Sequence, residues 1–190
     1  MRSARPIRTR IFLGCQGESE RSYAKLLHQL VENTHKLHID AILLNPGAGD
    51  PLATVERAIS LCRDRENKYG KYKTKAVLLD ADQMGLCPER DNQVKPLAAR
   101  NNMSLIWQKP CHEGFLLRHF PECYSHQPPT ANDAMERLRK CWPNYQKGMP
   151  ASSLAGQINL STIQAVCSVE TDLATFLAAL KYFVLPASRG

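Results

Sequence analysis

The chain has 190 residues, of which 43% are hydrophobic, and it carries a formal net charge of +7. This length suffices for one domain with a well-formed core, and because no apolar run reaches about 18 residues we expect no membrane span. The seven cysteines include no CxxC pair, which disfavours a zinc ribbon and fits a reducing cytoplasm, while the basic charge favours nucleic acid as a partner.

The hydrophobic pattern predicts strands that alternate with helices along the first two thirds of the chain. Apolar runs predict strands over residues 7–13, 39–44, 76–79 and 103–107. Between and after them, helices are predicted from a cap at Ser19, from Pro51, over residues 89–100 and over residues 113–120. Such alternation is typical of an α/β fold with a parallel sheet of about four strands and helices on both faces.

The pattern changes near residue 121, where a Pro-containing, linker-like stretch is followed by shorter helical segments. Apolar residues at helical spacing predict one helix around Leu138 and a last one from Leu173 to Val184. We therefore expect an α/β domain over residues 1–125 and a helical extension over residues 126–190 that packs on it as a cap.

Two carboxylates stand at the end of the third predicted strand. Asp80 and Asp82 follow the apolar run of residues 76–79, and residues i and i+2 of a strand point to the same side. Like charges so close repel unless a cation lies between them, and Mg²⁺ takes carboxylate oxygens as ligands. The alternative is a polar turn, in which Asp is common.

Other polar loops are expected to meet this pair. Ligand sites of parallel α/β sheets lie beyond the carboxyl ends of the strands. Four predicted loops leave such ends, and together they predict a site at one edge of the sheet: residues 16–20, 46–50, 80–82 and 110–113.

Five segments resemble, in the same order, motifs of the RloB-like proteins, a Toprim-related family. They are GCQGESERSY at 14–23, GDPL at 49–52, LDADQ at 79–83, KPCHEGFLLRHF at 109–120 and YQKG at 145–148. The matches are individually short but span most of residues 10–150.

The resemblance implies a Toprim-like fold, in which a loop glutamate and a DxD motif bind Mg²⁺ or Mn²⁺ for phosphodiester chemistry. On this basis Asp80, Asp82 and Glu20 are the metal ligands, and Glu18, Glu20 and Glu113 are the catalytic candidates. The family also implies a nuclease of bacterial anti-phage defence, acting by abortive infection beside an ABC-type ATPase. The sequence leaves open the substrate and whether copies of the chain associate.

The chain departs from the family pattern at the position of the general acid/base glutamate, which is Gln16. An amide cannot exchange a proton near neutral pH. A second hypothesis is therefore a catalytically silent subunit that binds nucleic acid or an ATPase partner. Residues predicted to contact the substrate in either case are Gln16, Lys109, Arg118, His119 and Lys147, although for His119 a packed position in the core is the competing interpretation.

A basic and aromatic run lies between the second helix and the third strand. It contains Lys68, Lys71, Lys73 and Lys75 with Tyr69 and Tyr72. Such a run suits the backbone and bases of nucleic acid; a solvated hairpin is the alternative.

Overall fold

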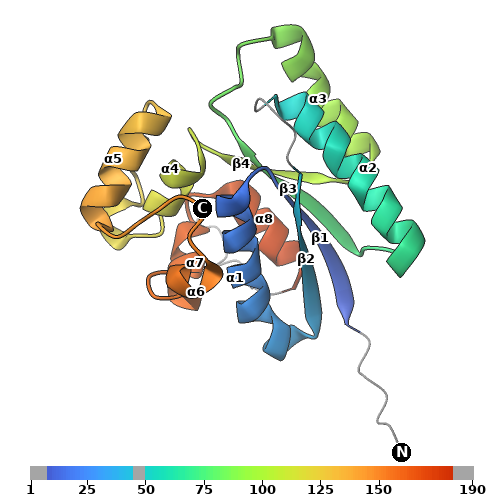
Figure 1. Cartoon of the computed structure of the whole chain (residues 1–190), viewed down its shortest axis with the longest axis horizontal. Coiled ribbons are helices and arrows are strands. Elements are labelled where there is room, and N and C mark those ends of the chain that lie inside the picture. The colour runs from blue at the N-terminus through green and yellow to red at the C-terminus, as the bar shows by residue number, and fades with distance from the viewer. Residues whose placement is uncertain (1–7, 45–49, 182–190) are drawn as a thin grey trace, which may run out of the picture.

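The computed structural model describes residues 8–44 and 50–181 (Figure 1). Its single sheet is all-parallel with the strand order β2-β1-β3-β4. The strands are β1 (Thr9–Cys15), β2 (Leu37–Leu43), β3 (Thr74–Asp80) and β4 (Ser104–Gln108). The predicted α/β class is confirmed, and each predicted strand is found within about two or three residues of its expected bounds.

In the described part of the chain a helix follows each strand, and four more helices come after α4. They are α1 (Glu18–His35), α2 (Pro51–Tyr69), α3 (Pro88–Arg100), α4 (His112–Leu117), α5 (Ala131–Cys141), α6 (Ala151–Leu154), α7 (Leu160–Val166) and α8 (Thr171–Ala179), with a short 3-10 turn η1 (Pro121–Cys123). No helix in the described ranges is long and apolar enough to cross a membrane.

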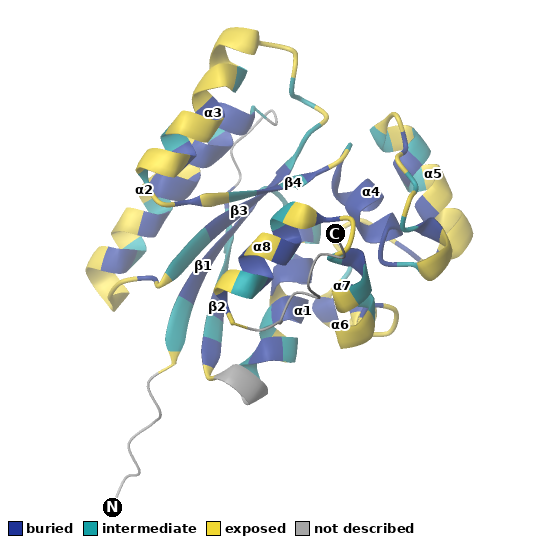
Figure 2. Cartoon of the chain, turned by 180° about the vertical axis from the view of Figure 1, so that it is seen from behind, coloured by how far each residue is buried: buried dark blue, intermediate teal, exposed yellow. Residues whose placement is uncertain are grey.

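Both faces of the sheet are buried, as continuous apolar strands require. Along β3, Ala76 and Leu78 belong to the core on the α1 side, whereas Val77 and Leu79 belong to the core on the α2 and α3 side. Figure 1 shows α2 and α3 on one face of the sheet and α1 and α8 on the other, and Figure 2 shows that the buried residues line these inner faces.

The C-terminal helices pack on the α1 side of the sheet. Leu138 of α5, Leu154 of α6, Ile163 of α7 and Phe176 of α8 share one buried cluster with Leu26 of α1. The predicted last helix is found as α8, which ends at Ala179; Val184 lies outside the described residues.

Several local predictions were wrong. Ser19 does not cap α1, because Gly17 is the capping residue and the helix begins at Glu18. The predicted loop over residues 68–73 begins later, because α2 continues to Tyr69 and ends at Gly70, whose φ of +89° suits a residue without Cβ. Trp107, in the fourth predicted strand, is only partly buried. Of the loop predicted over residues 46–50, residues 46–49 lie outside the described residues.

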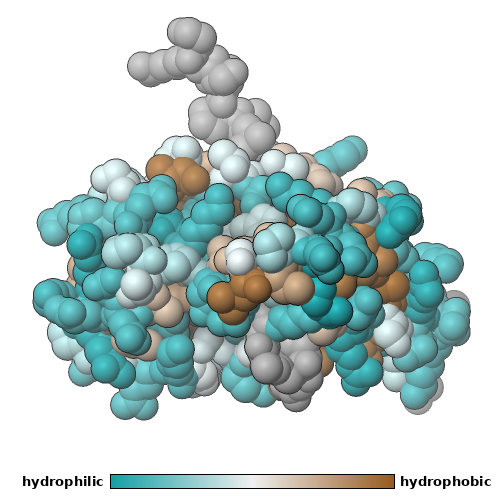
Figure 3. All heavy atoms as spheres, turned by 90° about the horizontal axis from the view of Figure 1, so that it is seen from above, coloured by the Kyte–Doolittle hydropathy of each residue, from teal (hydrophilic) through white to brown (hydrophobic). Residues whose placement is uncertain are grey.

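The surface is largely polar. The face drawn in Figure 3 carries only small, separate apolar patches among hydrophilic residues. In the described part of the chain, the exposed large hydrophobic residues are Tyr69, Leu86, Leu160 and Val169.

Candidate functional site

The carboxyl ends of three strands meet at one edge of the sheet. In the register, Cys15 at the end of β1 pairs with Leu78, and Asp80 at the end of β3 pairs with Gln108 at the end of β4. Gln16 follows β1 directly, and its side-chain Oε1 accepts a hydrogen bond from the backbone N–H of Asp80 at 3.1 Å. Gln16 therefore joins the first loop to the end of β3.

The first turn of α1 directs one of its two glutamates inward. Glu20 is only 5% exposed, and its Oε2 accepts a hydrogen bond from the N–H of Gly17 at 3.0 Å, which satisfies an otherwise unpaired donor of the helix start. Glu18 is exposed and pairs with Arg21 at 3.2 Å. Glu20, rather than Glu18, is thus the glutamate held next to the strand ends.

Asp80 is the electrostatic centre of this edge. Its Oδ1 is buried and accepts no hydrogen bond. Burial, and then the negative charges of Glu20, Asp82 and Glu113, raise the pKa of Asp80 to about 8, although a hydrogen bond from the backbone of His112 opposes the shift. These carboxylates are close enough to repel one another, and within the described residues no cation offsets the charge on Asp80 directly.

Glu113 lies in the first turn of α4 and is held by three groups. The thiol of Cys111 donates to Oε2 at 3.2 Å, and the hydroxyl of Tyr145 donates to Oε1 at 3.2 Å. The Nζ of Lys147 lies 3.5 Å from Oε1. Burial alone would raise the pKa of Glu113, but the Cys111 hydrogen bond and nearby positive charge outweigh it and lower the pKa. Glu113 is therefore ionised at neutral pH.

The start of α4 depends on a close backbone approach. A Cβ on Gly114 would lie 2.6 Å from the carbonyl oxygen of Lys109 and 2.8 Å from Cδ of Pro110. Only glycine fits at this position without a shift of the loop.

The tail segment of residues 145–148 reaches the same edge. Besides the contacts of Tyr145 and Lys147 with Glu113, the N–H of Gly148 donates to Oγ of Ser19 at 2.9 Å. Gly148 has a φ of +74°, the left-handed region that favours glycine. The tail is thus tied to both α1 and α4.

Three residues predicted to bind substrate lie elsewhere. His119 is buried; its Nδ1 contacts the carbonyl of Phe115 at 3.1 Å and its Nε2 contacts the hydroxyl of Tyr23 at 2.9 Å. Burial lowers the pKa of His119 to about 3, so the ring is neutral. This is the packed position that was the competing interpretation.

Arg118 is also buried and forms an ion pair with Glu170. Its Nη2 donates to the carbonyl of Lys109 at 2.9 Å. The exposed side chain of Lys109 lines a small pocket with Arg118, Glu170 and Asp172. Through its ion pair with Glu170, Arg118 links the end of α4 to the start of α8.

Sequence reasoning missed two polar residues beside the acidic group. Gln108 is fully buried, and its Nε2 lies 2.8 Å from Nδ1 of His112. Gln108 Oε1 and His112 Nε2 are buried without a hydrogen-bond partner. The available signal was the position of Gln108 at the end of the fourth strand, at the same edge as Asp80.

The residues fit a water-rich Mg²⁺ site rather than a closed metal cage. Among the described residues, no group of three or more His, Cys, Asp or Glu is arranged to hold a metal ion. Mg²⁺ is usually bound through one or two carboxylates together with water and substrate phosphates. The unpaired Oδ1 of Asp80, next to Glu20, is the kind of donor that such an ion needs.

Fold and site together define an α/β protein with a carboxylate-rich centre at the carboxyl edge of a parallel sheet. A family model described as RloB-like protein matches residues 11–176, so the chain belongs to the RloB-like protein family. Searches of curated proteins and of solved structures gave no match.

Proposed function

We propose that this protein is a metal-dependent phosphodiesterase that cleaves RNA or DNA, with its active site at the acidic edge. The observation that carries the proposal is the buried, unpaired Oδ1 of Asp80, surrounded by the charges of Glu20, Asp82 and Glu113. Keeping such a group is unfavourable without a ligand, and perturbed carboxylates of this kind are typical of functional sites.

Each residue has a role that follows from its environment. Asp80, Glu20 and the exposed Asp82 offer oxygen ligands to Mg²⁺ or Mn²⁺, and the bound ion would supply positive charge to a phosphoryl oxygen. Glu113, ionised and oriented by Tyr145, is placed to accept a proton. Lys147 is exposed beyond its contact with Glu113 and can neutralise a phosphate.

A second candidate function is that of a silent binding subunit, and one observation favours it. Gln16 stands where the family has its acid/base glutamate, and its carbonyl oxygen is already used by the N–H of Asp80. A glutamine in that contact holds the loop but transfers no proton.

We propose the same cellular setting for both functions. Family membership supports a role in bacterial anti-phage defence, with an ABC-type ATPase as partner. All seven cysteines are free thiols, which supports a reducing cytoplasm.

The deciding experiment is cleavage of mixed tRNA, single-stranded RNA, single-stranded DNA and duplex DNA by the purified protein in Mg²⁺ or Mn²⁺. Asp80→Ala should reduce cleavage at least about 100-fold, whereas Asp64→Ala, on the exposed face of α2, should not. Mn²⁺ alone should raise the melting temperature of the wild type and not that of Asp80→Ala. Cleavage that survives Asp80→Ala would refute the proposed site.

Binding of nucleic acid without cleavage, with both metals and with the ATPase present, would establish the silent subunit instead. Gln16→Glu then separates two causes. A gain of cleavage shows that the amide removed the activity, and no gain shows that the remaining residues are insufficient.

A further inference from the structure

The turn that joins α2 to β3 is strongly basic, together with the end of α2. Residues 63–75 contain six Lys or Arg and two Asp or Glu, a net charge of +4. The turn lies at the amino end of β3, and Asp80 ends the same strand six residues after Thr74. At about 3.3 Å per residue, the turn is about 20 Å from the acidic edge.

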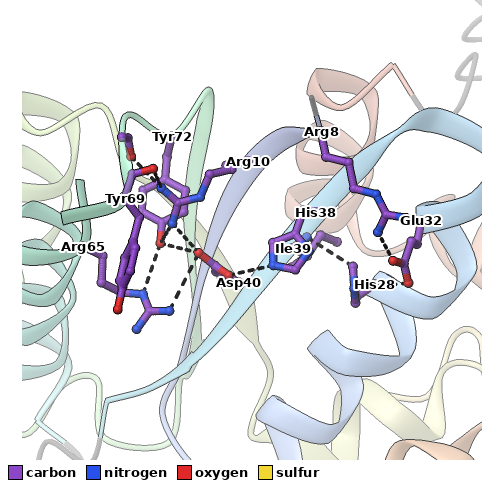
Figure 4. A network of polar contacts seen from close by, with 11 residues as sticks. Arg8, Arg10, His28, Glu32, His38, Ile39, Asp40, Arg65, Tyr69 and Tyr72 are labelled. Carbon is purple, nitrogen blue, oxygen red and sulfur yellow. Dashed lines mark hydrogen bonds and ion pairs between the residues drawn. The ribbon is translucent and has the colours of Figure 1, made fainter. Parts of the chain in front are cut away.

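An internal network fixes the shape of this turn (Figure 4). Arg10 of β1 donates to Oδ2 of Asp40 at 2.6 Å and to the carbonyls of Tyr69 and Gly70 at 2.8 and 2.7 Å. The hydroxyl of Tyr72 donates to the same Asp40 oxygen at 2.5 Å, and the guanidinium of Arg10 lies 4.2 Å from the Tyr72 ring centroid. The carboxylate of Asp40 and the ring of Tyr72 are thus both engaged in contacts within the protein.

Tyr69, by contrast, presents its ring to solvent. It is 53% exposed, the largest exposure among the aromatic residues of this turn. Three cations surround the ring, with Lys68 at 5.2 Å, Arg65 at 5.6 Å and Arg10 at 5.8 Å from its centroid. Figure 4 shows Tyr69 beside Arg65 and Arg10 at the margin of the network.

Several of the cations are not neutralised by acidic neighbours. Lys75 forms an ion pair with the buried Glu66, with 3.2 Å between Nζ and a carboxylate oxygen. The Nζ of Lys71 lies 3.5 Å from the same carboxylate, but the Lys71 side chain is 82% exposed. Arg63 bonds to the neutral side chain of Asn101, whereas Arg65 lies 3.9 Å from Oδ2 of Asp40. In the described parts of the chain, Lys68 and Lys73 have no acidic partner.

We propose that this turn is a binding surface for single-stranded nucleic acid, separate from the acidic edge. The α2–β3 basic surface consists of Arg63, Arg65, Lys68, Tyr69, Lys71 and Lys73. Its lysines and arginines fit successive phosphates, and the exposed ring of Tyr69 fits an unstacked base, which a single strand offers and a duplex does not. The surface does not depend on catalysis, so it serves a nuclease and a silent subunit alike.

The test measures binding of a fluorescein-labelled single-stranded oligonucleotide by anisotropy, in EDTA, so that no metal-dependent cleavage interferes. Replacing three lysines by alanine removes three phosphate contacts and should weaken binding at least about tenfold. It should also lower the slope of log K against log salt by about 2. The triple variant is Lys68→Ala, Lys71→Ala and Lys73→Ala; its matched control, with the same loss of charge on exposed positions of α5, is Arg137→Ala, Arg139→Ala and Lys140→Ala.

A second variant isolates stacking from charge. Tyr69→Ala should weaken binding at least about fivefold with an unchanged salt slope, and Tyr69→Phe should bind like the wild type. Because binding is measured in EDTA, loss of the proposed metal-dependent cleavage would not imply loss of this surface.

Three outcomes would overturn the proposal. The control triple variant could weaken binding as much as the turn variant, which would show that only the overall charge matters. A duplex of the same length could bind the wild type as tightly as the single strand does and lose as much affinity with Tyr69→Ala, which would exclude a single-strand site. The turn variant could instead lose binding only to vesicles of phosphatidylcholine and phosphatidylserine, which would identify a membrane surface as the partner.

Discussion

Asp80→Asn should stabilise the protein, and the gain should grow with pH. In the folded state the pKa of Asp80 is raised from 3.8 to about 8 by burial and neighbouring carboxylates. Between about pH 4 and pH 8 the folded chain therefore holds a proton that the unfolded chain releases. The contribution of Asp80 to the free energy of unfolding falls as pH rises through this window, and asparagine removes that loss.

The magnitude follows from the size of the shift. A difference of about four pKa units corresponds to about 5 kcal/mol at pH 8, as an upper limit. Part of this gain is offset because asparagine replaces an oxygen that accepts a hydrogen bond from the His112 backbone. We expect a gain of at least about 2 kcal/mol at pH 8 and about zero near pH 4, which corresponds to about 4–8 °C in melting temperature at the higher pH.

The assay is urea unfolding of wild type and variant at a series of pH values, in EDTA. Taking the difference between the two proteins cancels other titrating groups, such as His119. Asp64→Asn, which changes an exposed carboxylate on α2, is the control and should show no pH-dependent gain. If Asp80→Asn is equally or less stable than the wild type at every pH, then burial and repulsion do not destabilise the ionised form of Asp80.

Three further substitutions test the supports of the site. Gly114→Ala places a Cβ 2.6 Å from a carbonyl oxygen and should lower the free energy of unfolding by about 1–3 kcal/mol in denaturant titrations; an unchanged midpoint would contradict the close approach. Arg118→Ala leaves Glu170 buried and unpaired and should cost about 3–5 kcal/mol, most of which the double variant Arg118→Met, Glu170→Met should recover. Tyr145→Phe should raise the pKa of Glu113, seen by carboxyl NMR titration, because the carboxylate loses a donor.

The local pattern of the sequence was sufficient for the sheet. Strands buried on both faces need apolar residues at every position, and the runs around Ile11 and Leu78 have this pattern. Parallel order then places all carboxyl ends at one edge, so the proximity of Glu20 and Asp80 followed from chain topology and the family motifs. Helix starts were less certain, because Gly17 rather than Ser19 caps α1 through a contact made by Glu20.

The tertiary structure alone decided which polar residues are available for chemistry. Arg118 and His119 have the composition of a phosphate-binding pair, but Glu170 and Tyr23, far away in the chain, hold them in the core. The pKa of Asp80 likewise depends on burial and on charges from other elements. Burial and long-range pairing arise only when distant segments pack together, and a local pattern of residue types does not encode which partner each polar group will meet.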